Sequence, residues 1–180
     1  ADEIMVRYPA TMQLAFGSML VALLVAFPLG IISAIYRNSW IDNVARFFAL
    51  VGVSMPSFWF GPLLIMIFAI HWQWFPVSGR EQGLRSIVLP SLTMGLSLAA
   101  ILTRMIRVSL AEELTQLYVT TAFAKGVGKM KAIFAHALKN AMIPVITVLA
   151  LQFGSLLTGA IITEQIFSWP GLGRLLIQSI

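Results

Sequence analysis

Four long stretches without a charged side chain constrain the fold of this sequence more than any other feature. They contain 29, 33, 18 and 24 residues and lie between Arg7 and Arg37, Arg46 and Arg80, Arg85 and Arg104, and Lys139 and Glu164. A helix needs about 20 apolar residues to cross a hydrocarbon core of about 30 Å. Because lipid offers no partners to backbone polar groups, each segment must pair its own, and we expect helices. The predicted spans are residues 10–35, 44–70, 86–108 and 141–163.

The composition excludes a water-soluble globular domain. Of the 180 residues, 59% are hydrophobic and 11% are charged, and the mean hydropathy is +0.90. An average soluble domain has about 25% charged residues. The net charge of +5 therefore concerns membrane orientation and does not predict a nucleic-acid partner. The sequence has no cysteine, which excludes a disulfide framework, a thiolate metal site and a cysteine nucleophile.

The distribution of basic residues predicts the orientation of the spans. Eight fall on one side of the predicted membrane: Arg37, Arg46, Arg104, Arg107, Lys125, Lys129, Lys131 and Lys139. Four fall on the other side: Arg7, Arg80, Arg85 and Arg174. The positive-inside rule then places the loops 36–43 and 111–140 in the cytoplasm, and both chain ends outside. We expect the side chains of Arg104 and Arg107, at the end of the third span, to reach the interface. Trp72, Trp74 and Trp169 fall on the outer side, as in an aromatic belt.

The two ends of the sequence suggest a larger parent protein. Ala1 is not an initiator methionine, and no basic segment with a cleavage site precedes the first span. We therefore expect residues 1–180 to be one transmembrane domain, and a fragment that lacks a span at each end.

The segment 111–140 has the pattern of two amphipathic helices separated by Gly126 and Gly128. In the first half, the residues that recur at the spacing of one helical face are Leu114, Leu117, Tyr118, Thr121, Ala122 and Lys125. Those of the second half are Met130, Ile133, Phe134, Ala137, Leu138 and Ala141. Such helices either lie on lipid headgroups or present a surface to a partner protein.

Several runs resemble one known family. The run YVTTAFAKGVGKMKAIFAHALKNAMIPVITVLALQFGSLLTGAIITEQIFSWPGLGRLL, residues 118–176, is similar to the coupling loop and following helix of ABC transporter permeases of the dipeptide/oligopeptide/nickel type. The runs RYPAT (7–11), GVSMPSFW (52–59) and LPSLTMG (89–95) fit the same family in the same order. The chain departs from the family pattern at Leu117, Thr120 and Phe123, where acidic or basic residues are usual, so no particular salt bridge to a partner is carried over.

The resemblance implies an all-α, polytopic membrane protein with the core of a type I ABC importer permease. Its expected place is the prokaryotic inner membrane, and its expected cargo is peptides or similar small solutes. Nickel chelates and glutathione are the alternatives within the family, and a passive channel or membrane scaffold lies outside it. Such a subunit is a transporter and no enzyme. The sequence has no P-loop lysine motif, so ATP and magnesium are expected on partner subunits and this chain is expected to bind no cofactor.

The resemblance also implies partners and contact residues. The expected partners are a second, homologous permease subunit in a heterodimer, two ABC ATPase subunits, an extracytoplasmic substrate-binding protein and membrane lipid. The ATPase-coupling residues are expected to be Tyr118, Thr121, Ala122, Ala124, Lys125 and Gly126. Gly126 would permit a backbone turn that a side chain opposes.

Polar residues inside the spans are candidates for a translocation path. Gln152, Ser155 and Gly159 share one face of the fourth span, and the alternative is close helix packing by small residues. Pro56 interrupts the second span, where a static kink is favoured over a hinge.

The segment 164–180 is expected to be an external loop that lies near the docked binding protein. Its candidate residues are Glu164, Trp169, Pro170, Gly171 and Arg174, and for Glu164 the alternative is a solvated helix end. The sequence offers neither a metal site nor a constellation of nucleophile, base and orienting residue, so no catalytic residue is predicted.

Overall fold

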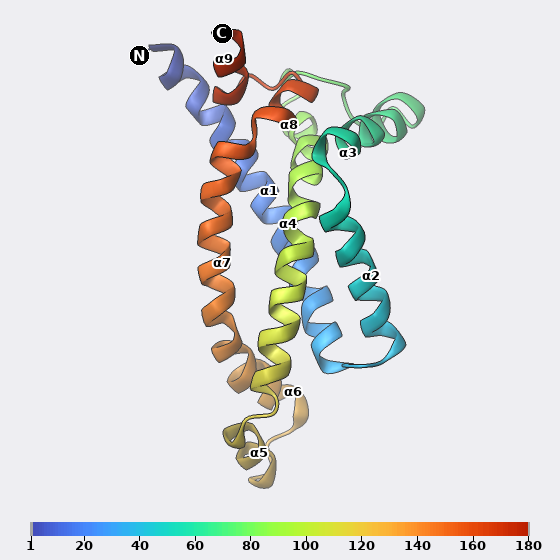
Figure 1. Cartoon of the computed structure of the whole chain (residues 1–180), viewed down its shortest axis with the longest axis vertical. Coiled ribbons are helices and arrows are strands. Elements are labelled where there is room, and N and C mark those ends of the chain that lie inside the picture. The colour runs from blue at the N-terminus through green and yellow to red at the C-terminus, as the bar shows by residue number, and fades with distance from the viewer. Residues whose placement is uncertain (1, 180) are drawn as a thin grey trace.

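The computed structural model describes residues 2–179, and the side chains of all of these except Asp2, Thr158 and Gly159. The described chain is helical, without a strand. Its elements are α1 Asp2–Ile35, α2 Trp40–Ser54, α3 Ser57–Leu64, η1 Ile65–His71, α4 Leu84–Glu113, α5 Leu117–Ala124, α6 Lys129–Ala132, η2 Ile133–Ala137, α7 Leu138–Gly159, α8 Ile161–Ile166 and α9 Leu172–Gln178. The segments η1 and η2 are π-helical. The long helices α1, α4 and α7 lie along the long axis of the molecule, with α2 beside them (Figure 1).

The apolar stretches become long helices, as predicted. Three helical segments are long and apolar enough to cross a membrane: Glu3–Ile35, Leu84–Glu113 and Lys129–Leu157. All three run beyond the predicted spans at one end or both. The first begins at Glu3, α4 continues past Arg104 and Arg107 to Glu113, and the third begins at Lys129. Charged residues do not break these helices, so a helix continues past the end of an uncharged stretch.

The pair α1 and α4 forms the centre of the molecule. Ala15, Ala22 and Ala26 are buried at helical spacing and pack against Leu98 and Leu102. Two glycines permit the close approach: a Cβ on Gly95 would lie 2.7 Å from the Ser18 carbonyl oxygen, and one on Gly30 would lie 2.8 Å from the Ile106 side chain. Small residues at the contact are typical of helix pairs in membranes.

The predicted second span, residues 44–70, is sharply divided. It consists of Trp40–Ser54 and Ser57–His71, which meet at an angle of 104°. Pro56 lacks a backbone N–H and disfavours helical backbone in the residue before it, and Met55 accordingly adopts φ −82° and ψ 116°. A bend of this size is larger than the static kink that the sequence suggested.

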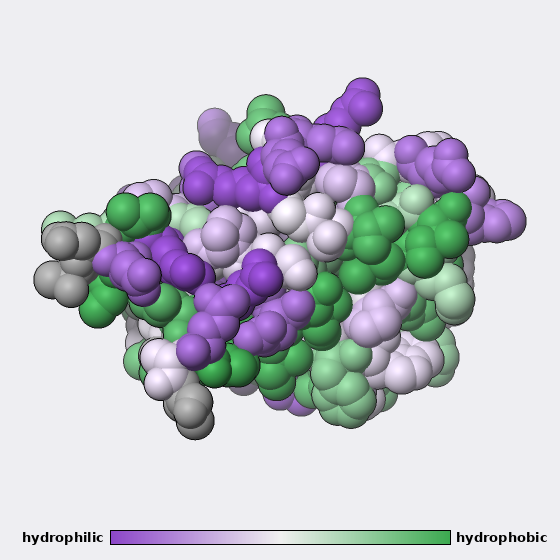
Figure 2. All heavy atoms as spheres, turned by 90° about the horizontal axis from the view of Figure 1, so that it is seen from above, coloured by the Kyte–Doolittle hydropathy of each residue, from purple (hydrophilic) through white to green (hydrophobic). Residues whose placement is uncertain are grey.

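The end of the molecule that carries α8, α9 and both termini is partly hydrophilic (Figure 2). The exposed polar residues at this end include Arg80, Glu81 and Gln82 between η1 and α4, and Arg85 in the first turn of α4. At the opposite end, α5 and α6 project beyond α2 (Figure 1).

Candidate functional site

The predicted coupling loop forms a short helix held against the bundle. The helix α4 ends at Glu113, a turn follows, and α5 begins at Leu117. Val119 of α5 is fully buried and packs in a cluster with Leu110, Ala137 and Ala141. The loop therefore packs against both long helices that it connects.

The outer face of α5 is exposed and largely apolar. Tyr118, Thr121, Ala124, Lys125 and Gly126 are exposed, as a contact surface requires, and Ala122 is half-buried. Leu117 and Phe123, at which the chain departs from the family pattern, are 83% and 42% exposed. Leu114, which the pattern placed on the same face, lies outside α5 in the preceding turn.

Tyr118 connects α5 to the end of α4. Its hydroxyl donates a hydrogen bond to the Glu113 carboxylate. Burial, and then this bond, raise the pKa of the Tyr118 phenol above its usual value. The hydroxyl is therefore protonated at neutral pH, and the contact is lost only as the pH rises past the raised pKa. The acidic partner of Tyr118 is thus Glu113, which lies five residues earlier in the chain.

Gly126 ends α5 in a tight turn. Its φ is +81°, in the left-handed region that favours glycine, and its N–H donates to the Phe123 carbonyl over 2.9 Å. A Cβ at Gly126 would meet nothing within 4 Å, so the backbone conformation alone requires glycine. Gly128 has φ −61°, a value that other residues adopt readily. Only the first glycine of the pair is thus required by the turn.

At the other end of the molecule, Glu164 is fully buried and forms hydrogen bonds with residues of α1 and α9. Its carboxylate accepts hydrogen bonds from the Thr11 hydroxyl, over 2.8 Å, and from the Arg174 N–H, over 3.0 Å. A Cβ on Gly171 would lie 2.1 Å from the same carboxylate. The alternative of a solvated helix end is therefore wrong, and the segment that was predicted as a loop is folded into α8 and α9 against α1.

Trp169 strengthens the same contact. It is 1% exposed, and its indole N–H donates to the Ala10 carbonyl over 2.8 Å. Its predicted place in an aromatic belt is wrong, whereas Trp72 and Trp74 are exposed and stack with ring centres 4.6 Å apart. Arg174 is half-buried, and its guanidinium donates to the Ser168 carbonyl over 2.8 Å. Pro170 is half-buried in the turn between them.

The candidate path residues lie on the outer half of α7. The Ser155 hydroxyl donates to the carbonyl and to the side-chain oxygen of Gln152, over 2.9 and 3.1 Å. Gln152 is half-buried and Ser155 is exposed. Gly159 is the last residue of α7, and its surroundings lie outside the described side chains. The structure thus brings Gln152 and Ser155 together on a helix that the rest of the chain covers only in small part.

The sequence reasoning missed a buried ion pair. Asp42 is fully buried and accepts two hydrogen bonds from the Arg107 guanidinium, over 2.6 and 2.7 Å. Ser33 of α1 donates to the same carboxylate over 2.5 Å. The expectation that Arg107 reaches the interface is therefore wrong, because its side chain turns inward and is 15% exposed. These residues are 65 positions apart, and nothing near either of them in sequence signals the pairing.

The described residues contain no group of three or more histidine, aspartate or glutamate side chains that could hold a metal ion.

The comparison with known families identifies the chain. A family model described as "Binding-protein-dependent transport system inner membrane component" matches residues 26–180. The chain belongs to this family. Membership confirms the predicted helical membrane fold, the place in the inner membrane and the class of transport component rather than enzyme.

Individual relatives agree with the family. The chain is 43% identical over 180 residues to the glutathione transport system permease protein GsiC of Escherichia coli strain K12 and to that of Shigella flexneri serotype 5b. It spans 58% of the length of these relatives. Among solved structures, an amino acid ABC transporter crystallised with histidines matches with a TM-score of 0.70 at 17% identity, over 99% of this chain and 79% of that one. This last similarity shows the fold.

Proposed function

We propose that this chain forms part of the transmembrane subunit of an ATP-driven importer and conducts peptides or similar small solutes. The single observation that carries the proposal is a family match over residues 26–180 that includes an exposed helix projecting from the bundle. The relatives named for glutathione transport fit the alternative of a glutathione importer, and glutathione is itself a small peptide. Nickel chelates are the other alternative within the family.

The partners follow from the proposed role. An ATPase dimer would receive α5 of this chain and the equivalent helix of a second, homologous permease subunit. An extracytoplasmic binding protein would dock at the end that carries α8 and α9. ATP and magnesium would be bound by the ATPase subunits. The spans 10–35, 44–70, 86–108 and 141–163 would then connect a cytoplasmic loop 111–140 to an external segment 164–180.

Coupling through α5 follows from how the helix is held. Val119 is buried between the ends of α4 and α7, whereas Leu117, Tyr118 and Phe123 are exposed. A partner that grips the exposed side chains would move α4 and α7 together. Rigid displacement of packed helices is a common form of conformational change between two states. Gln152 and Ser155 on α7 would line the path that this movement opens.

A channel or scaffold would use the same spans without such a helix, and the coupling surface separates these classes. The test is affinity purification of the full-length protein co-expressed with its neighbouring genes, with Gly126→Val and Gly128→Val compared. Both side chains would enter open space, but only Gly126 has a positive φ. A β-branched residue there costs about 1–2 kcal/mol, or about 5- to 30-fold in a folding equilibrium.

We expect an ATPase to co-purify with the native protein and with the Gly128→Val variant. The amount of ATPase that co-purifies with the Gly126→Val variant should be lower. If no ATPase associates with the native protein, the importer proposal fails. If the two valine variants lose the ATPase equally, the turn at Gly126 does not present the contact surface.

A further inference from the structure

Two adjoining cavities lie along one side of α2, between that helix and α4. The first, of 330 Å³, is lined by Arg46, Arg104 and Arg107. The second, of 380 Å³, extends away from them between α1, α2 and α4. They share four lining residues: Ala45, Ala49, Ala100 and Thr103. Together they form one cleft, here called the α2–α4 cleft, with a basic end and an apolar end.

The basic end has an excess of positive charge. Its three arginines face one acid, Asp42, which is fully engaged by Arg107 and lies 3.5 Å from Arg46. The local charge is therefore +2. The Arg104 side chain is exposed, and its guanidinium makes no hydrogen bond or ion pair with any side chain that the structure describes. An anion that enters the cleft would find one arginine without a partner and a second that is only partly neutralised.

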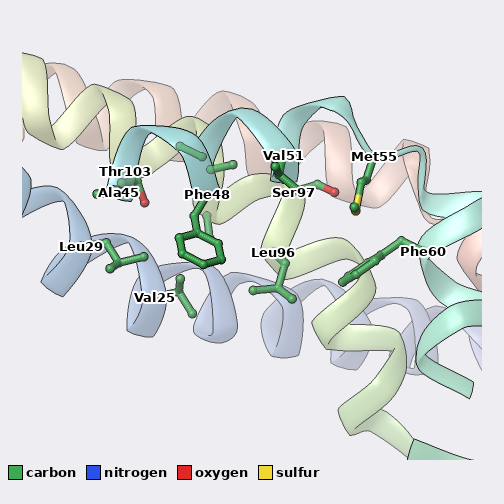
Figure 3. Close-up of a pocket in the computed structure, with 14 residues that line it drawn as sticks. Val25, Leu29, Ala45, Phe48, Val51, Met55, Phe60, Leu96, Ser97 and Thr103 are labelled. Atoms are coloured by element: carbon green, nitrogen blue, oxygen red, sulfur yellow. The ribbon is translucent and has the colours of Figure 1, made fainter. Parts of the chain in front are cut away.

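The apolar end is suited to hydrocarbon. Its walls include Val25 and Leu29 of α1, Phe48 of α2 and Leu96 of α4. Figure 3 shows carbon along almost the whole lining, with the hydroxyls of Ser97 and Thr103 as the polar exceptions among the labelled side chains. A free phosphate ion would make no favourable contact with this apolar half of the cleft.

The position of the cleft along the predicted spans suits a lipid, which has a polar headgroup at the interface and acyl chains in the hydrocarbon region. Along α2 the two parts of the cleft cover the same stretch, from Ala45 to Ser54 or Met55, whereas along α4 the lining passes from Val108 at the basic end to Leu96 at the apolar end. The basic end is therefore nearer the end of the bundle that carries α5, where Trp40 is 74% exposed, and tryptophan is typical of the membrane interface. The apolar end lies within the predicted hydrocarbon region. Basic pockets between transmembrane helices bind anionic lipid headgroups elsewhere.

We propose that the α2–α4 cleft binds one anionic phospholipid from the leaflet on the α5 side. Its phosphate lies between Arg46 and Arg104, and an acyl chain follows the groove past Ala49 toward Phe48 and Leu96. The lipid replaces the solvent and loose lipid that would otherwise cover the buried ion pair between Asp42 and Arg107. Lipid binding in the α2–α4 cleft does not depend on which solute the protein transports.

The test is native mass spectrometry of the purified full-length protein, titrated with phosphatidylglycerol or phosphatidylcholine in detergent. The first variant is the double change Arg46→Gln and Arg104→Gln, which removes the partly neutralised charge of Arg46 and the charge of Arg104. The second is Ala49→Phe, which fills the groove. The matched control is the double change Arg37→Gln and Arg85→Gln at exposed arginines outside the cleft. Circular dichroism checks that every variant is folded.

We expect the native protein to retain one phosphatidylglycerol in preference to phosphatidylcholine. Binding should fall about fivefold for each cleft arginine removed, the factor that corresponds to about 1 kcal/mol per basic residue near an anionic surface. Ala49→Phe should lower it as well, and the control should bind as the native protein does.

Four results would overturn the proposal. Equal retention of the two lipids would show no anion selectivity, and an equal loss in the control would show diffuse attraction. Displacement by inorganic phosphate at matched ionic strength would indicate a free-anion site. If Ala49→Phe blocked assembly with a second subunit while lipid retention was unchanged, a protein segment would occupy the groove.

Discussion

At the scale of single residues, two buried carboxylates hold helices that are far apart in sequence. Asp42 connects α1, α2 and α4 near the α5 end, and Glu164 connects α1, α8 and α9 at the other end. Each accepts several hydrogen bonds while fully buried. A buried charge of this kind is costly unless all its partners are present, so both sites should be sensitive to small changes.

Glu164→Gln should destabilise the protein. The amide keeps the acceptor for Thr11 but turns an NH₂ group toward the Arg174 N–H, so that two donors face each other. We expect a loss of about 1–3 kcal/mol, the cost of an unsatisfied buried group, measured by thermal unfolding of the full-length protein in detergent. The control is Glu81→Gln, at an exposed acid of the same end. Equal effects of the two changes would show that the buried contacts contribute nothing.

The ion pair between Asp42 and Arg107 can be tested by a double-mutant cycle. Asp42→Asn or Arg107→Met alone should cost about 3–5 kcal/mol, because each leaves an uncompensated buried charge. The double variant should be more stable than the sum of the two losses predicts. Unfolding midpoints of the four proteins give the coupling energy, and strictly additive losses would contradict a direct pair.

At the scale of helices, the close contact between α1 and α4 depends on glycine. Gly95→Ala would place a Cβ 2.7 Å from the Ser18 carbonyl oxygen and should cost about 1–3 kcal/mol through overpacking. Gly154→Ala is the matched control, because it lies in α7 with nothing within 4 Å of the new Cβ. It should be neutral or stabilising by up to about 1 kcal/mol, as alanine favours helices. A Gly95→Ala protein that unfolds at the native temperature would refute the close approach.

The helices were largely predictable, and the contacts between them were not. Helical spans follow from uncharged stretches, which are a local property of the sequence. The sharp bend at Pro56 was underestimated, since proline predicts a break but not the angle between the parts. Thr11 and Glu164 are 153 positions apart, and Asp42 and Arg107 are 65 apart. No periodicity in one segment reveals a partner at such a distance. For the candidate site, the helical pattern predicted a helix that the structure has as α5, and the coupling role of its residues stays a prediction. The anchoring residue Val119 was missed because valine carries no distinctive signal in an apolar helix.

At the scale of the whole molecule, the chain combines a rigid pair, α1 and α4, with a helix, α7, that it covers only in part. The lower end carries a projecting α5, and the upper end carries α8 and α9, clasped to α1 through Glu164 (Figure 1). Under the proposed function, each end would offer a surface to a partner, and the long helices between the two ends would transmit movement.

The most direct test of this account is solute uptake by the complete, full-length assembly reconstituted in vesicles, with labelled glutathione and a labelled dipeptide as probes. We expect accumulation against a gradient that needs both ATP and the binding protein. Replacing Leu117 and Phe123 of α5 by serine should abolish ATP-driven uptake while membrane insertion is retained, and replacing the exposed Leu84, far from α5, should not. Equilibration of either solute without ATP, unaffected by the α5 changes, would contradict the account and indicate a passive channel.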